Sequence, residues 1–194
     1  MTTESKLEPA GFEARELRHR ATPLRYLVGG SGPPLVLVHG LGGAPSNWRL
    51  VAPALAAERR VIVPALPGHG GSGRLPAAPT LDPYAEAVLA VLEHEDALPA
   101  PWVGHSLGGT VGLRAAVCRP DAVTGLVLAA AAGISSSTRA GAATVAAIGR
   151  VQPERLVRRH RRRVALSPLG RTLTFGWWGV ADPVGFEPAM AEAF

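Results

Sequence analysis

The sequence has little of what marks a secreted or membrane-spanning protein. Cys118 is the only cysteine among 194 residues, so no internal disulfide can form, and a reducing compartment is the simplest setting. The opening stretch MTTESKLEPAGFE lacks the apolar core of a signal peptide. The longest apolar runs, such as LVLAAAAGI at 126–134, are far too short to span a bilayer. We therefore expect a cytoplasmic protein with no membrane partner.

Lysine is almost absent as well: the sequence has one lysine, Lys6, and 19 arginines. Residues 1–136 hold 11 basic and 11 acidic residues, whereas residues 137–194 hold 9 arginines and 4 acidic residues. Most of that excess lies in RLVRRHRRRV at 155–164. A basic run can bind nucleic acid, but no aromatic residue interleaves with these arginines, as a base-stacking surface requires. We interpret the run as a solvated helix face and expect no nucleic-acid partner.

Apolar residues, in contrast, are plentiful at 47%, and 23 glycines and 18 prolines imply many tight turns. Short continuous apolar runs predict strands that are buried on both faces, and stretches with helical periodicity lie between them. This alternation predicts a mostly parallel sheet covered on both faces, which is a three-layer α/β sandwich. Strands are expected at 35–40, 60–66, 101–105 and 123–132, a hairpin at 14–30, and helices at 46–58, 81–98 and 107–119, the first two capped by Ser46 and Asp82.

The stretch GHSLGG places Ser106 between a predicted strand and a predicted helix. The pattern Gly-x-Ser-x-Gly in that setting is a nucleophile elbow, a sharp turn that exposes the serine hydroxyl beyond the sheet edge. Gly104 and Gly108 would let strand and helix approach closely, and the helix N-terminus carries a partial positive charge. The backbone N–H of Leu107 would then donate a hydrogen bond to a developing oxyanion.

Two further motifs stand at the ends of the preceding predicted strands. His39-Gly40 ends the first buried strand, and PGHGGSG at 67–73 follows the second. The carboxyl ends of parallel strands meet at one edge of a sheet, so these loops are expected near the serine. Together with GHSLGG, the motifs make the chain resemble the α/β-hydrolase superfamily, in the branch with a serine nucleophile. The resemblance covers residues 14–135 and implies the α/β-hydrolase fold.

The resemblance also assigns roles to residues of the predicted site. It implies that Ser106 is the catalytic nucleophile and that the backbone N–H groups of Leu41 and Leu107 form the oxyanion hole. It implies no metal and no organic cofactor. Packing in a helix core explains Trp48 as well as a place near the pocket does. The substrate is expected to lie against Gly40, His105 and Trp48.

The acid and the base of a serine triad have no convincing candidates in this sequence. In the superfamily both follow the serine along the chain, after late strands. His160 follows Ser106 but stands among arginines, and strand alternation directs His105 away from the Ser106 hydroxyl. Asp121 is expected at the opposite edge of the sheet, and Asp182 is interpreted as a helix cap.

We expect two structural units. Residues 1–135 form the hydrolase core, and residues 136–194 form a helical cap that is cut short. The resemblance implies about two more strands, without which the strand at 123–132 would be an open apolar edge. The simplest interpretation is that the sequence is the front portion of a longer enzyme.

The function expected from the sequence is that of a serine hydrolase acting on an ester, thioester or related carbonyl bond through an acyl-enzyme at Ser106. Its partner would be a small-molecule substrate, an apolar acyl compound. The alternative is a catalytically inactive remnant that lacks the triad acid and histidine and serves in binding or as half of a split enzyme. Carbon–carbon bond hydrolases, peptidases, acyltransferases and haloperoxidase-type enzymes share the elbow and stay open, as does the oligomeric state.

Overall fold

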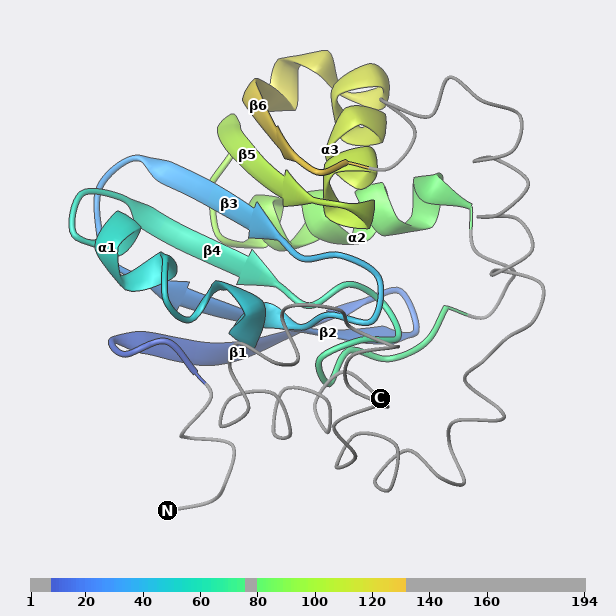
Figure 1. The fold of residues 1–194 in the computed structure, drawn as a ribbon. Coiled ribbons are helices and arrows are strands. Elements are labelled where there is room, and N and C mark those ends of the chain that lie inside the picture. The colour runs from blue at the N-terminus through green and yellow to red at the C-terminus, as the bar shows by residue number, and fades with distance from the viewer. Residues whose placement is uncertain (1–7, 76–79, 132–194) are drawn as a thin grey trace, which may run out of the picture. The chain divides into compact units, whose positions relative to one another are not determined.

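The computed structural model describes residues 8–75 and 80–131 of the chain (Figure 1). Six strands form one sheet in the order β1-β2-β4-β3-β5-β6. The strands are β1 Phe12–His19, β2 Thr22–Gly29, β3 Pro34–Val38, β4 Arg60–Pro64, β5 Ala100–His105 and β6 Val123–Ala129. The helices are α1 Ala52–Ala56, α2 Leu81–His94 and α3 Leu107–Cys118, with short 3-10 turns η2 Pro45–Trp48 and η3 Pro120–Ala122.

The sheet is mixed but mostly parallel. β1 and β2 form the predicted hairpin, and β2 pairs antiparallel with β4. β4, β3, β5 and β6 then run parallel to one another. Figure 1 shows α1 on one side of the sheet and α2 and α3 on the other. These layers confirm the predicted α/β sandwich and place the carboxyl ends of β3, β4 and β5 at one edge.

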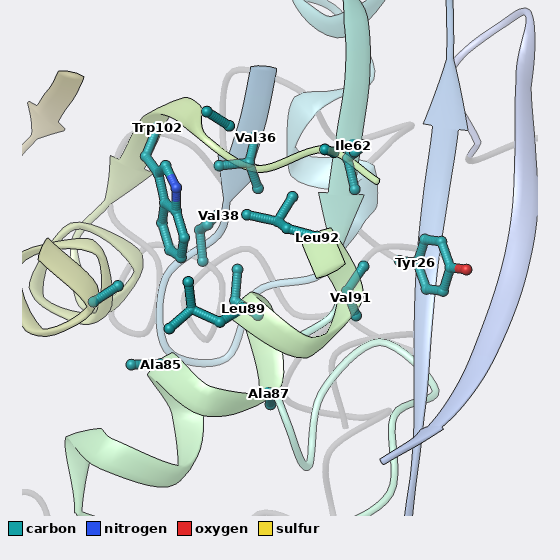
Figure 2. Packing of buried hydrophobic residues seen from close by; sticks show 14 of the residues in the cluster. Tyr26, Val36, Val38, Ile62, Ala85, Ala87, Leu89, Val91, Leu92 and Trp102 are labelled. Atoms are coloured by element: carbon teal, nitrogen blue, oxygen red, sulfur yellow. The ribbon is translucent and has the colours of Figure 1, made fainter. Parts of the chain in front are cut away.

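Two apolar clusters hold the layers together because alternate strand residues face opposite sides. On the side of α2 and α3, Val36, Val38 and Trp102 pack with the apolar face of α2 (Figure 2). On the side of α1, Leu37 and Val63 pack in a smaller cluster. The central strands β3 and β4 are therefore buried on both faces, as their continuous apolar runs predict.

The predicted helix over 46–58 is interrupted. Its first part is the 3-10 turn η2, and α1 begins only at Ala52. Pro53 explains the break: proline lacks the N–H that a helix interior needs, so it is tolerated only in the first turn, and α1 begins one residue before it. Ser46 makes no cap: it lies inside η2, and its buried Oγ has no hydrogen-bond partner in the described part of the chain.

The start of α2 also differs from the prediction. Thr80 occupies the N-cap position, and Asp82 lies in the first turn instead of capping it. The Asp82 carboxylate accepts a hydrogen bond from the guanidinium of Arg114 on α3, and this pair lowers the pKa of Asp82. Asp82 thus joins two helices where a helix cap was predicted.

A buried carboxylate, Glu95, ties the end of α2 to the antiparallel part of the sheet. It accepts hydrogen bonds from the Tyr26 hydroxyl (2.7 Å), from Arg15 Nη1 (2.8 Å) and from Arg60 Nη2. Burial raises the pKa of Glu95, but these hydrogen bonds and the two positive charges outweigh burial and lower it overall. The cluster lies near the first residue of β4, at the sheet edge away from Ser106.

β6 is less buried than its apolar sequence predicts. Among the described residues it pairs only with β5, and Val127 is 58% exposed. No helix of residues 8–75 and 80–131 is long and apolar enough to cross a membrane. The predicted cap over 136–194, with its basic run, His160 and Asp182, lies outside the described residues.

Candidate active site

Ser106 occupies the sharp turn between β5 and α3. Its backbone has φ 50° and ψ −115°, a conformation that residues with a side chain rarely adopt. Two backbone hydrogen bonds help to fix the turn: the Ser106 N–H donates to the Ala129 carbonyl (2.9 Å), and the Ser106 carbonyl accepts from the Gly109 N–H (3.1 Å). Such strain costs on the order of 1–3 kcal/mol and persists mostly at functional sites.

Glycines make the turn possible because two backbones come very close there. A Cβ atom at Gly104 would lie 2.5 Å from the backbone of Gly108 and Gly109. A Cβ atom at Gly108 would lie 2.2 Å from the Val38 carbonyl oxygen at the end of β3. The start of α3 is therefore pressed against both strands that flank the site.

The loop after β3 lies directly beside Ser106. A Cβ atom at Gly40 would be 3.1 Å from the Ser106 Cβ and 3.0 Å from the His105 Nδ1. The backbone N–H groups of Leu41 and Leu107 have no hydrogen-bond partner among the residues that the structure describes. Two unpaired donors on the loop and the helix next to a serine are what an oxyanion hole requires.

His39 joins this loop to the loop after β4. The ring is fully buried, its Nε2 accepts the Leu66 N–H (3.0 Å), and its Nδ1 lies 2.8 Å from the Gly40 carbonyl oxygen. A backbone N–H can only donate, so Nε2 is the acceptor and Nδ1 carries the proton of the neutral ring. Burial lowers the pKa of His39 to about 3, against the raising effect of the Gly40 hydrogen bond, while His69 and His105 lower it further.

The loop PGHGGSG is folded on itself and anchored to β2. Ser72 is buried; its Oγ accepts the Arg25 N–H (2.9 Å) and donates to the Ala65 carbonyl (2.9 Å). The Gly73 N–H donates to the Pro23 carbonyl (2.8 Å). This anchoring was not predicted from the sequence, although a serine within a glycine-rich loop is the signal that could have indicated it.

The structure brings only some of the predicted site residues together. Gly40 and His105 lie next to Ser106, as the contacts above show, and the His105 side chain is exposed. Trp48 instead packs against the cluster on the side of α1, with its buried Nε1 unpartnered in the described part of the chain. A substrate contact for Gly40, His105 and Trp48 stays a prediction.

The described residues hold no complete serine triad. No hydrogen bond joins the Ser106 Oγ to a histidine within residues 8–75 and 80–131. His39 uses both ring nitrogens in the bonds described above. Over the same residues, no three His, Cys, Asp or Glu side chains are grouped so that they could share a metal ion.

Comparison with known proteins assigns the family. The profile of the alpha/beta hydrolase fold family matches residues 33–175, which is well over half of the chain. The chain belongs to the α/β-hydrolase fold family. The fold agrees with the crystal structure of a candidate lipase from Acinetobacter baumannii, with a TM-score of 0.64 and 31% identity over 71% of this chain and 48% of that one.

Two curated relatives are similar in sequence. One is the dihydrolipoyllysine-residue acetyltransferase component of the acetoin cleaving system of Pseudomonas putida, 50% identical over 57% of this chain and 30% of its own length. The other is the pimeloyl-[acyl-carrier protein] methyl ester esterase of Aromatoleum aromaticum, 46% identical over 50% of this chain and 36% of its own length. The chain thus spans about a third of the length of these relatives.

Proposed function

We propose that the protein is a hydrolase in which Ser106 attacks an ester, thioester or related carbonyl carbon and forms an acyl-enzyme. The observation that carries this proposal is the left-handed backbone of Ser106 between β5 and α3. The unpaired N–H groups of Leu41 and Leu107 beside it support the proposal. A binding module would have no use for a strained serine between two free donors.

In the proposed mechanism the Ser106 Oγ adds to the carbonyl carbon while its proton passes to a general base. The carbonyl electrons move to the oxygen, and the N–H groups of Leu41 and Leu107 stabilise that oxyanion. Collapse of the intermediate expels an alcohol or thiol, which takes up the proton. Water then attacks the acyl carbon and releases the acid. The proposal takes the base and its carboxylate partner from outside the described residues.

An apolar acyl substrate fits this proposal. The side chain of Leu41 is 70% exposed on the loop that carries the proposed oxyanion donor. An apolar side chain beside a reacting carbonyl favours an apolar acyl group over a charged one. The esterase from A. aromaticum acts, by its name, on the methyl ester of an acyl chain, which supports an ester as the first substrate to test.

Hydrolysis of an activated p-nitrophenyl ester by the complete protein tests the proposal. Ser106→Ala should remove several orders of magnitude of rate, because it deletes the attacking oxygen. Ser46→Ala is the matched control: it deletes a buried hydroxyl without a partner in the described part of the chain, and the rate should stay unchanged. A fluorophosphonate should add its mass to the wild type but not to Ser106→Ala. Equal ester rates for wild type and Ser106→Ala would favour a non-catalytic binding protein.

A further inference from the structure

We infer that Ser72 is a positioning residue for the oxyanion hole, acting through an unbroken line of hydrogen bonds that ends at the Leu41 N–H. The inference rests on the proposed function, because it gives the line a role in the same reaction. Ser72 lies in the PGHGGSG loop and makes no recorded contact with Ser106. Its influence would therefore reach the site only through the groups between them.

The first half of the line runs from β2 to the loop after β4. The Arg25 N–H donates to the Ser72 Oγ at 2.9 Å, and the Ser72 hydroxyl donates to the Ala65 carbonyl at 2.9 Å. The hydroxyl has one proton, and its alternative acceptor, the Arg25 carbonyl, is farther away at 3.5 Å. The Ala65 carbonyl belongs to the same peptide unit as the Leu66 N–H, so a bond to one side of this unit orients the other.

The second half repeats this arrangement with an imidazole and another peptide unit. The Leu66 N–H donates to the His39 Nε2 at 3.0 Å, and the His39 Nδ1–H donates to the Gly40 carbonyl at 2.8 Å. The Gly40 carbonyl shares its peptide unit with the Leu41 N–H. The Gly43 N–H also donates to this carbonyl, at 3.1 Å. In a trans peptide the C=O and N–H groups point in opposite directions, so the bond from His39, together with that from Gly43, fixes the direction of the Leu41 N–H.

Every donor in the line points the same way, toward the Leu41 N–H. Hydrogen bonds arranged head to tail polarise one another, which strengthens the last donor. The members are shielded from water: Leu66 and His39 have no exposed surface, Ala65 is 2% exposed and Ser72 is 8% exposed. The line thus both aims the Leu41 N–H and strengthens it at the place where an oxyanion would form.

The catalytic test compares Ser72→Ala with Ser46→Ala in the complete protein. Ser72→Ala should lower kcat for the p-nitrophenyl ester about tenfold with little change in KM, because the transition state depends on the donor more than the ground state does. Rates are divided by the concentration of Ser106 that reacts with a fluorophosphonate, which removes the effect of unfolded protein. Ser46→Ala should keep its kcat within about twofold, since its Oγ has no partner in the described part of the chain.

The outcomes separate the two proposals. A wild type with no Ser106-dependent hydrolysis would overturn the proposed function and the positioning role with it. An active wild type whose kcat per reactive serine survives Ser72→Ala, or falls equally in Ser46→Ala, would overturn the positioning role alone. Nitrogen-15 NMR of the wild type gives a test without variants: His39 should show a protonated Nδ1 and an unprotonated Nε2 from pH 5 to 8, and the opposite tautomer would break the line.

Discussion

Gly108 lies against the end of β3: a Cβ atom at Gly108 would be 2.2 Å from the carbonyl oxygen of Val38. The obstacle is a backbone atom of a central strand, which cannot rotate away as a side chain could. The turn at Ser106 and the end of β3 are therefore fitted together through this one glycine.

Gly108→Ala should destabilise the protein by more than about 3 kcal/mol, at the upper end of overpacking costs, because β3 or α3 must move. Urea unfolding followed by circular dichroism measures the change. Gly125→Ala is the control, since a Cβ atom there would meet nothing within 4 Å. Gly125→Ala should change the free energy of unfolding by less than about 1 kcal/mol, and the alanine variant should be the more stable one. Similar losses for both variants would contradict the close fit.

The strained backbone of Ser106 predicts an unusual response to glycine. Ser106→Gly should be more stable than Ser106→Ala by about 1 kcal/mol, because only glycine adopts a φ of 50° without a steric cost. At Ser46, which has no such backbone, the order should reverse, because glycine adds entropy to the unfolded chain. The urea midpoints of the four variants test this prediction. A lower midpoint for Ser106→Gly than for Ser106→Ala would show that the turn is unstrained.

The ion cluster around Glu95 predicts an effect on stability far from Ser106. Glu95→Gln should destabilise the protein by about 2 kcal/mol, because the buried Glu95 carboxylate is the shared counter-charge of Arg15 and Arg60, whose side chains stay 38% and 29% exposed to water. Glu93→Gln is the matched control, two residues earlier in the chain. Its ion pair with Arg119 is exposed, so removing the charge should cost less than about 1 kcal/mol. Thermal unfolding of the two variants at pH 7 provides the comparison.

The same cluster makes the stability of the protein depend on pH, with a loss on the acid side. The folded protein lowers the pKa of Glu95 below its unfolded value of 4.5, so the folded state holds this proton less tightly. The stability from Glu95 is therefore fully present above that value and is lost as the pH falls through the folded pKa. Glu95→Gln should lose this part of the acid sensitivity, whereas Glu93→Gln should keep it. Identical acid profiles for the two variants would show that Glu95 does not carry the effect.

The elements of the fold were predictable because their signals are local. Apolar runs identified β3, β4 and β5 within one or two residues, and the glycines around Ser106 indicated the sharp turn between β5 and α3. Pro53 is a local signal for the interruption between η2 and α1, but apolar periodicity over 46–58 predicts one continuous helix instead. A proline that begins one helix also ends the one before it, and periodicity alone does not show this.

The contacts that support the site were not predictable, because they join residues far apart in the chain. Ser72 bonds to Arg25 across 47 positions, and Glu95 bonds to Arg15 across 80. Nothing near either residue indicates its partner, since the first bond depends on how β2 and β4 are placed side by side and the second on how β1 lies against the end of α2. The role of His39 could not be predicted either, because it depends on a hydrogen bond from the Leu66 N–H, in the loop after β4, to the His39 Nε2.

His39, in the loop after β3, is another acid-sensitive group, with a pH window of its own. Burial lowers the pKa of His39 to about 3 in the folded protein, while the unfolded chain has the ordinary value of 6.5. The unfolded state thus binds the proton more tightly, and stability falls as the pH drops from 6.5 toward 3, by up to about 5 kcal/mol. Glu95 acts only below about pH 4.5, so the window from pH 6.5 to 5 separates the effect of His39 from that of Glu95.

Urea unfolding of wild type and His39→Gln at several pH values between 5 and 6.5 tests this dependence. The variant should be less stable at pH 7, because it loses a buried ring and its two hydrogen bonds. Its stability should nevertheless fall less steeply toward pH 5, because glutamine has no proton to take up on unfolding. Comparing slopes instead of absolute stabilities removes the effect of the lost packing. Equal slopes would mean that His39 binds its proton as tightly in the folded as in the unfolded protein, and a ring charged in this way cannot accept the Leu66 N–H.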